Sequence, residues 1–258
     1  MLRRAAAEDL PFIRKLCADS IIGCKILCQV LAYGFERDFL EVWIMQENDV
    51  VTAIITKFYD DAALVADEAF DEEQLCAFFD MFDCNTVMLS HKVAVKLGFD
   101  KTTVKNGYKF NGSVSDFTVD SLVEEDLRAA YELISREIPG SFKQGREAYL
   151  SFISDFTFRQ RRSMARGVCT HSNGSLTSVA VTSCETERSA VISGVACDSS
   201  QRKKGLGKLT VLSMVEKLLK DGKMPYVIAL NESAEGFYEH IGFIKSEMIV
   251  FTERKKDV

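Results

Sequence analysis

The segment Asp198–Leu219, DSSQRKKGLGKLTVLSMVEKLL, places glycines and basic residues where a phosphate group could bind. The turn RKKGLGK (202–208) comes directly before apolar residues at helical spacing. Glycines let backbone N–H groups approach a ligand oxygen, and a helix start adds unpaired N–H groups and the positive end of the helix dipole. The spacing matches neither the dinucleotide-binding GxGxxG nor the P-loop GxxxxGK[ST]. A basic glycine turn that binds no ligand is the alternative interpretation.

A second motif follows one predicted helix and one predicted buried strand further along the chain. It reads NESAEGFYEHIGF (231–243) and places Tyr238 on a short predicted helix before a Gly-Phe turn. A phenol can donate a proton to a leaving group in a reaction. The alternative is that the ring of Tyr238 only packs in the core.

Together the two motifs resemble those of the GCN5-related N-acetyltransferases (GNAT). RKKGLG (202–207) is similar to the family's R/Q-x-x-G-x-G/A signature, and 231–243 is similar to its N-x-x-A-x-x-F-Y-x-x-x-G-F motif. The matching positions of the second motif are Asn231, Ala234, Phe237, Tyr238, Gly242 and Phe243. The resemblance covers residues 114–258 in sequence and residues 1–113 only in architecture.

The resemblance implies an α/β fold, acetyl-coenzyme A (acetyl-CoA) as co-substrate and direct attack by an amine on the acyl group. Backbone amides of the turn would bind the coenzyme pyrophosphate, and a bulged strand at Gly194–Cys197 would hold the pantetheine arm and polarise the thioester carbonyl. Tyr238 would protonate the departing thiolate. The implied coenzyme-binding residues are Val195, Ala196, Cys197, Arg202, Lys203, Lys204, Gly205, Leu206, Gly207, Lys208, Asn231, Ala234 and Phe237.

The general base is the part of the family pattern that this sequence lacks. Many GNAT members have a glutamate where this chain has Val191. The candidates nearby are Glu185 and Glu187, with Asp198 after the strand. A water chain or an amine of low pKa would also serve, and Ser193 or His171 could contribute indirectly. Cys197 stands where the family commonly has a strand valine, so we expect a buried thiol and no nucleophile.

Hydrophobic periodicity predicts a mixed α/β order that runs through the chain twice. The first half is expected to contain helix 7–31, broken near 22–23, strands 40–45, 50–58 and 62–66, helix 72–82, strand 86–89 and helix 92–97. The second half is expected to contain strand 116–119, helices 124–137 and 146–161, strands 166–170, 176–184 and 191–197, helix 206–220, strand 226–230, helix 234–240 and strand 246–252. VMLSHKVAVKLGF (87–99) also resembles VIALNESAEGFYEHIGF (227–243), which favours a duplication.

The first copy lacks the features that would bind a coenzyme. Its third strand is followed by DEAFDEEQLCAFFDMF (67–82), with acidic residues in place of basic ones and no glycine pair. Ala94 stands where the second copy has Tyr238. We therefore expect tandem GNAT-like domains: a degenerate one at 1–113 that walls the substrate cleft, and a catalytic one at 114–258. The polar stretch 106–113 is the predicted boundary.

Charge and composition indicate which classes of molecule the protein can bind. The net charge is −6, and the first 113 residues hold 12 Lys and Arg against 18 Asp and Glu. An acidic chain without a basic stripe is a poor nucleic-acid binder. The acidic first half favours a small-molecule cationic amine as substrate, while amino acids, peptide N-termini and protein lysines are the other amines that the resemblance allows. The oligomeric state that we expect is a monomer or a weak homodimer. A non-catalytic acyl-CoA sensor or scaffold is the alternative function.

The cysteines and the N-terminus favour a cytoplasmic protein. Eight cysteines occur without a CxxC pair, and no secretion signal or 18-residue apolar run precedes or interrupts them. Cys17, Cys24 and Cys28 are expected on one helix face, where they act as small core residues and not as a zinc site. No metal and no membrane contact are expected.

Overall fold

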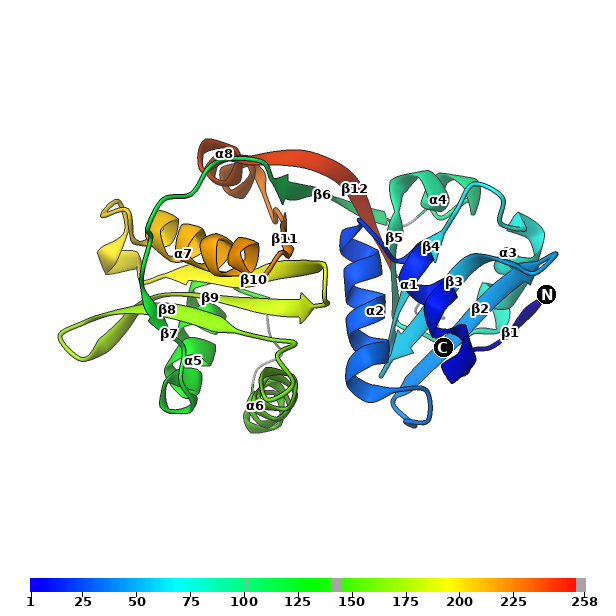
Figure 1. The fold of residues 1–258 in the computed structure, drawn as a ribbon, viewed down its shortest axis with the longest axis horizontal. Helices are drawn as coiled ribbons and strands as arrows, with labels where there is room; N and C mark the ends of the chain where they lie inside the picture. The colour runs from blue at the N-terminus through cyan, green and yellow to red at the C-terminus, as the bar shows by residue number, and fades with distance from the viewer. Residues whose placement is uncertain (101, 141–144, 254–258) are drawn as a thin grey trace. The chain divides into compact units, whose positions relative to one another are not determined.

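The computed structural model describes residues 1–100, 102–140 and 145–253 (Figure 1). Its elements follow one order twice: strand, 3-10 helix, two helices, three strands, helix, strand, helix, strand. The second copy differs only by a further 3-10 helix, η3, before its third α-helix. The predicted mixed α/β fold built as a tandem repeat is confirmed.

The first copy starts at the N-terminus and ends at residue 110. Its sheet has the order β1-β2-β3-β4-β5, antiparallel except for the parallel pair β4–β5. Its elements are β1 (Leu2–Arg4), η1 (Ala7–Asp9), α1 (Leu10–Leu16), α2 (Ile21–Tyr33), β2 (Leu40–Glu47), β3 (Val50–Phe58), β4 (Asp61–Ala66), α3 (Glu72–Met81), β5 (Thr86–Ser90), α4 (His91–Lys96) and β6 (Thr102–Phe110).

The second copy repeats this arrangement over longer elements. Its sheet has the order β7-β8-β9-β10-β11, and only β10–β11 is parallel. Its elements are β7 (Asp120–Ser121), η2 (Glu124–Asp126), α5 (Leu127–Glu137), α6 (Arg146–Gln160), β8 (Gly167–Ser172), β9 (Ser175–Glu185), β10 (Ser189–Cys197), η3 (Ser199–Gln201), α7 (Leu206–Lys220), β11 (Met224–Ile228), α8 (Glu232–His240) and β12 (Phe243–Glu253).

Two compact units correspond to the copies, but they are not contiguous segments. Unit 1 comprises Met1–Tyr108, Ala229–Glu235 and 245–253, and unit 2 comprises Lys109–Ile228 and Gly236–Ile244. The last strand belongs to unit 1 because Ile249–Glu253 of β12 pair antiparallel with β5. A single division of the chain at residue 113 would instead assign β12 to the second domain.

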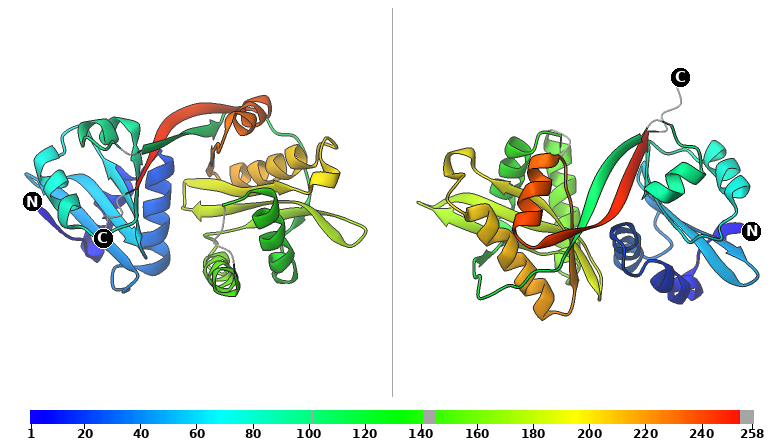
Figure 2. Two further views of the ribbon diagram at one scale, coloured as in Figure 1. Left: turned by 180° about the vertical axis from the view of Figure 1, so that it is seen from behind. Right: turned by 90° about the horizontal axis from the view of Figure 1, so that it is seen from above.

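Helices cover both faces of the sheet within each unit. In unit 1, α1 and α2 pack on one face and α3 and α4 on the other; in unit 2, α7 packs on one face and α5 and α6 on the other (Figure 2). The core of unit 2 beneath α5 and α6 contains Leu127, Ile134, Phe156 and the strand residues Cys169 and Val181. This layered packing buries the apolar side of each element.

Three predicted elements need correction. The first helix ends at Leu16, and α2 begins at Ile21 because Ser20 caps it by accepting a hydrogen bond from the Gly23 N–H. The polar stretch at 106–107 is not a loop but part of strand β6, in which Tyr108 and Phe110 are buried, while the division between the units, after Tyr108, does fall within the predicted stretch 106–113. The strand expected at 116–119 is the short β7 at Asp120–Ser121.

Cys17, Cys24 and Cys28 are all buried in unit 1, as expected of core residues, but they do not share one helix: Cys17 is the C-cap residue of α1, and Cys24 and Cys28 lie on α2. Among the described helices, none is long and apolar enough to cross a membrane.

Candidate active site

The site in unit 2 begins where strand β10 loses one of its two neighbours. β10 is in register with β11 from Ser189 to Ile192, while its pairing with β9 continues to Cys197. The register on β9 shifts between Ser193 and Ala196, and Gly194 between them has φ +53°. This bulge is the one expected from the sequence. It leaves backbone groups at the end of β10 available to a ligand on the β11 side.

A left-handed turn then directs the chain into helix α7. Lys203 has φ +63° and Gly205, the N-cap residue of α7, has φ +80°, a conformation that favours glycine. Its N-cap residue, being glycine, offers no side-chain cap, and the first turn of α7 contains no acidic residue. The first N–H groups of a helix have no partner within the helix, so the N–H of Leu206 can donate to a ligand oxygen. The N–H of Gly207 faces the Cys197 thiol, which is only a weak acceptor. Lys203, Lys204 and Lys208 are exposed around this turn.

Ion pairs with α5 hold the turn in place, which the sequence did not reveal. The side chain of Glu137 is only 7% exposed and accepts from Arg202 Nη2 at 2.6 Å and Arg136 Nε at 3.0 Å. Arg136 Nη2 also reaches Asp198 Oδ2 at 2.7 Å. Arg202, expected to contact the coenzyme, thus also anchors the loop to the end of α5.

Buried hydroxyl groups connect α7 with both strands beneath it. Thr210 Oγ1 lies 2.9 Å from Ser178 Oγ on β9, and Ser178 Oγ lies 3.2 Å from the carbonyl oxygen of Ala196 on β10. Thr210 Oγ1 also donates to the Leu206 carbonyl. Buried polar groups of this kind fix the spacing between the helix that starts at the glycine turn and the bulged strand.

Tyr238 on α8 is buried among aromatic rings. Its ring centroid lies 5.3 Å from that of Phe237 and 5.6 Å from that of Phe243. Burial raises the pKa of the Tyr238 phenol to about 12. Within the described part of the chain the hydroxyl has no hydrogen-bond partner, and it is not among the fully enclosed polar atoms that lack one. The phenol therefore stays protonated, and none of the described residues accepts its hydrogen.

The glycines and phenylalanines of the second motif have packing roles that place α8. Gly242 has φ +104°, and a Cβ there would lie 3.1 Å from the Cα of Gly112. Asn111 N–H donates to the Gly242 carbonyl at 3.0 Å. Phe237 reaches the turn, since its Cζ lies 4.0 Å from the position of a Cβ on Gly207. The helix that carries Tyr238 thus packs against the start of α7.

The carboxylates considered as bases are held in other interactions. Glu185 is fully buried; its oxygens accept from Arg166 Nε and Nη2 at 2.8–3.1 Å, from Lys223 Nζ at 2.7 Å and from Thr182 Oγ1 at 2.7 Å. Hydrogen bonds from Ser200, with the charges of Arg136 and Arg202, lower the pKa of Asp198. These contacts argue against Glu185 and Asp198 as proton acceptors. Val191 is buried within the sheet.

The other predicted residues divide between the site and local roles. Glu187 is exposed in the β9–β10 turn, and its role as a base stays a prediction. Asn231 caps α8 by accepting a hydrogen bond from the Ala234 N–H at 2.9 Å. The contact of Asn231 and Ala234 with a coenzyme stays a prediction. His171 pairs with Asp126 at the start of α5, away from the end that holds the turn.

Cys197 ends the bulged strand directly beside the glycine turn. Burial raises the pKa of its thiol, opposed by the Arg202 charge and by a hydrogen bond from the Gly207 N–H. A protonated thiol agrees with the expectation that Cys197 is no nucleophile. The contact also shows that the end of β10 and the start of α7 converge at one place.

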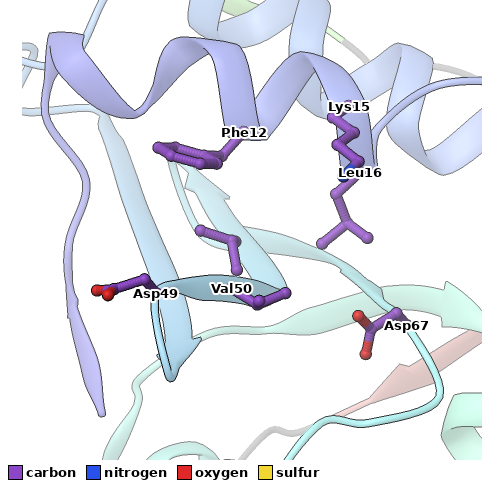
Figure 3. A pocket seen from close by; sticks show the side chains of 7 residues that line it. Phe12, Lys15, Leu16, Asp49, Val50 and Asp67 are labelled. Carbon is purple, nitrogen blue, oxygen red and sulfur yellow. The ribbon is translucent and has the colours of Figure 1, made fainter.

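Unit 1 has different chemistry in the corresponding region. The segment after β4 carries Asp67, Glu68 and Asp71, and α3 begins with two further glutamates. A cavity of about 230 Å³ lies between α1, the β2–β3 turn and this segment (Figure 3). It is lined by Phe12, Lys15, Leu16, Asp49, Val50, Val51 and Asp67. With two carboxylates and one lysine, this cavity does not suit a pyrophosphate.

Comparison with known proteins agrees with this geometry. Residues 167–252, which include the bulged strand, the turn and Tyr238, match the family model described as FR47-like protein. No curated protein matches this chain. An acetyltransferase of the GNAT family from Colwellia psychrerythraea is similar in structure, with a TM-score of 0.64 at 14% identity over 99% of this chain and 100% of that one.

The chain is a GNAT-fold protein. Two further GNAT structures are similar over its whole length. One is a GCN5-related N-acetyltransferase from Sphaerobacter thermophilus, with a TM-score of 0.63 at 15% identity over 100% of this chain and 97% of that one. The other is a tandem GNAT protein from the clavulanic acid biosynthesis pathway, with a TM-score of 0.64 at 13% identity over 100% and 99%. At these identities the likeness shows the GNAT fold only. Within this fold, the glycine turn and Tyr238 both lie in unit 2.

Proposed function

We propose that the protein is an acyl-CoA-dependent N-acyltransferase that moves an acetyl group from acetyl-CoA to the primary amine of a small molecule. Its one active site would lie in the C-terminal domain. The observation that carries this proposal is the convergence of the bulged end of β10 with the start of α7, at Cys197 and Gly207. A diphosphate needs N–H donors, and an extended arm needs a free strand edge.

The residues of the chain would divide the reaction between binding and proton transfer. When bound, acetyl-CoA supplies an activated acyl group as a thioester. The N–H groups of Leu206 and Gly207 would bind its pyrophosphate, with Lys203, Lys204 and Lys208 adding charge. Backbone groups of Val195 to Cys197 would hold the arm and polarise the carbonyl. Tyr238, a neutral phenol whose pKa burial raises to about 12, would donate to the departing thiolate.

No carboxylate base is part of this proposal. The family glutamate is replaced by Val191, and Glu185 already accepts from three side chains. An amine that is neutral at the working pH would satisfy the chemistry. Glu187 comes two residues before β10, at the opposite end of that strand from Cys197. The same observation favours a second candidate, a sensor that binds acyl-CoA without transferring the acyl group.

The test is thiol release from acetyl-CoA with a panel of amines, comparing wild type with Tyr238→Phe. Loss of a general acid should lower kcat by about 100-fold or more while the KM for acetyl-CoA changes little. Tyr149→Phe is the matched control, since Tyr149 contacts Tyr131 in the α5–α6 layer. Calorimetry provides the binding measurement: tight acetyl-CoA binding with no turnover would support the sensor, and no binding would refute both candidates.

A further inference from the structure

Four side chains of metal-binding type meet at the start of α5 in unit 2. Asp126 Oδ1 lies 3.1 Å from His171 Nε2, and Asp126 Oδ2 lies 3.9 Å from Cys169 Sγ. The three ligand atoms all lie within 4.8 Å of one another. Asp120 Oδ2 stands 3.7 Å from the other ring nitrogen, His171 Nδ1. The site contains a thiol, an imidazole and two carboxyl groups.

The surrounding elements point these groups at one another. Cys169 and His171 are two residues apart on β8, and Cys169 is the register partner of Asp120 on β7. Asp126 is the N-cap residue of α5, a position where aspartate usually binds the helix N–H groups. Its carboxylate caps nothing and turns to the thiol and the imidazole instead. Cys169 is fully buried, whereas His171 and Asp126 are partly open to solvent.

The first copy has a different set of residues at the same four positions. There Arg3 on β1 is the register partner of Ile44 on β2, and Asp9 is the N-cap residue of α1. The β2 register shifts before Gln46 just as the β8 register shifts before His171. Asp120, Asp126, Cys169 and His171 therefore correspond to Arg3, Asp9, Ile44 and Gln46.

The two sets differ in charge. In unit 1 the guanidinium of Arg3 binds Asp9 at 2.7 and 2.8 Å and Gln46 at 3.3 Å, which leaves the cluster neutral. In unit 2 an aspartate replaces the arginine. No lysine or arginine of the described residues forms an ion pair with Asp120 or Asp126. With a neutral imidazole the second cluster has a formal charge of −2 and no cation of its own.

We propose that this cluster binds a zinc ion, with Asp126, Cys169 and His171 as ligands. Asp120 would orient the imidazole through its second ring nitrogen, Nδ1. Thiolate, imidazole and carboxylate are the donors that zinc takes, and three protein ligands leave its fourth position to water. Tetrahedral zinc at its usual bond lengths places such ligand atoms about 3.5 Å apart. The observed 3.1 Å from Asp126 Oδ1 to His171 and 3.9 Å from Asp126 Oδ2 to Cys169 lie on either side of that value, and all three ligand atoms lie within 4.8 Å of one another. A carboxylate on the second ring nitrogen is the usual partner of a zinc-bound histidine.

The ion would be structural and not part of acyl transfer. Asp126 precedes α5, whereas Arg136 and Glu137, which hold the glycine turn, are at the opposite end of that helix. Eleven helical residues separate the two places by roughly 16 Å. The zinc would join β7, β8 and the start of α5 in place of the arginine that does so in unit 1.

The test uses full-length protein freed of metal by chelation and then titrated with zinc or cobalt. We expect one equivalent of zinc to bind and to raise the melting temperature. Cobalt should give a thiolate-to-metal charge-transfer band that Cys169→Ser abolishes. Asp120→Asn should lower zinc affinity by about 10- to 100-fold, and His171→Asn or Asp126→Asn by at least as much. His240→Asn and Cys184→Ser are the matched controls and should bind as wild type does.

Asp120→Arg gives a second measurement that does not depend on removing a ligand. It recreates the arrangement of Arg3 and Asp9, so the variant should fold, bind no zinc and melt at a temperature independent of zinc. The proposal is overturned if wild type binds no zinc at micromolar concentration, if the cobalt complex lacks the thiolate band, or if His171→Asn binds zinc as wild type does.

Discussion

At the scale of single residues, burial has opposite consequences for two ionisable groups that the sequence suggested as catalytic, Tyr238 and Glu185. Tyr238 is surrounded by aromatic rings and has no hydrogen-bond partner among the described residues, so its proton is available. Glu185 is equally buried but binds Arg166, Lys223 and Thr182. Its lone pairs are occupied in a structural ion pair, and a group in that state is a poor base.

The raised pKa of Tyr238 predicts a pH profile without an alkaline limb of its own. A phenol donates only below its pKa, so donation should be lost as pH rises through about 12 and not through the ordinary value of about 10. With the amine saturating, kcat should therefore stay level from about pH 8 to 10.5. The measurement is initial-rate kinetics across that range. A descending limb near pH 10 would contradict the burial that the structure gives this ring.

Comparing Glu185→Gln with Glu187→Gln tests which of these two carboxylates stabilises the fold and which acts as a base. Removing the Glu185 charge leaves Lys223, whose side chain is 11% exposed, without its carboxylate, and leaves Arg166, whose side chain is 24% exposed, with Asp221 alone. The free energy of unfolding should therefore fall by about 3 kcal/mol. The kcat per folded molecule should not change. Glu187 is exposed, and its variant should be within about 0.5 kcal/mol of wild type.

Denaturant melts and kcat measurements on the same preparations check this pair. If Glu187→Gln lowers kcat at unchanged stability, Glu187 is the base. If Glu185→Gln lowers kcat without loss of stability, the structural role assigned to Glu185 is wrong.

At the scale of elements, the two glycines of the turn have separable roles. Gly205 has φ +80° with open space around it, so Gly205→Ala should cost about 1 kcal/mol of stability through backbone strain. Gly207 lies within α7, where a Cβ meets only Phe237 at 4.0 Å, so Gly207→Ala should leave stability equal or raise it by about 0.5 kcal/mol. Its methyl group would stand where the pyrophosphate is proposed to bind.

We therefore expect Gly207→Ala to raise the KM for acetyl-CoA by about tenfold, which is the effect of losing one hydrogen bond to a charged group. Gly222→Ala, at the other end of α7 with φ +72°, is the control: it should destabilise as Gly205→Ala does and leave KM unchanged. Thermal melts and steady-state kinetics give both quantities. An unchanged KM in Gly207→Ala would show that the coenzyme does not bind at this turn.

At the scale of the whole molecule, the first unit depends on the last strand of the chain. Val250 of β12 is buried in the core cluster that also contains Leu64 and Phe79, and β12 pairs with β5. Glu247 Oε1 accepts from the Ile21 N–H at the start of α2 at 2.8 Å. Both ends of the chain are thus needed to complete one core.

This return predicts that residues 1–113 alone do not form a stable domain. Without β12 the fragment would expose β5 and the apolar residues around Val250, and it should show non-cooperative thermal melting by circular dichroism. Adding a peptide of residues 245–253 should restore a cooperative transition. A fragment that melts cooperatively by itself would mean that the division at residue 113 is a true domain boundary.

The sequence predicted most elements because their local signals were strong. Helix 206–220 and the hairpin around 173–174 follow from periodicity and turn residues, and the structure confirms both. Strand β6 was missed because Asn106 and Gly107 are typical turn residues, and the structure nevertheless includes them in a strand. The break before α2 was misplaced because Ser20 as a cap is a weaker signal than Gly23 within the helix.

What the sequence determined by itself was the turn RKKGLGK, the tyrosine motif and the duplicated α/β order, because each is a pattern of neighbouring residues. What only the tertiary structure decided was which groups meet across the fold. It showed that Glu185 is bound to Arg166 and that Glu137 forms an ion pair with Arg202. It also showed that Cys169, His171 and Asp126 lie close together and that β12 pairs with β5 of unit 1. These contacts join residues distant in the sequence, so no local pattern could reveal them.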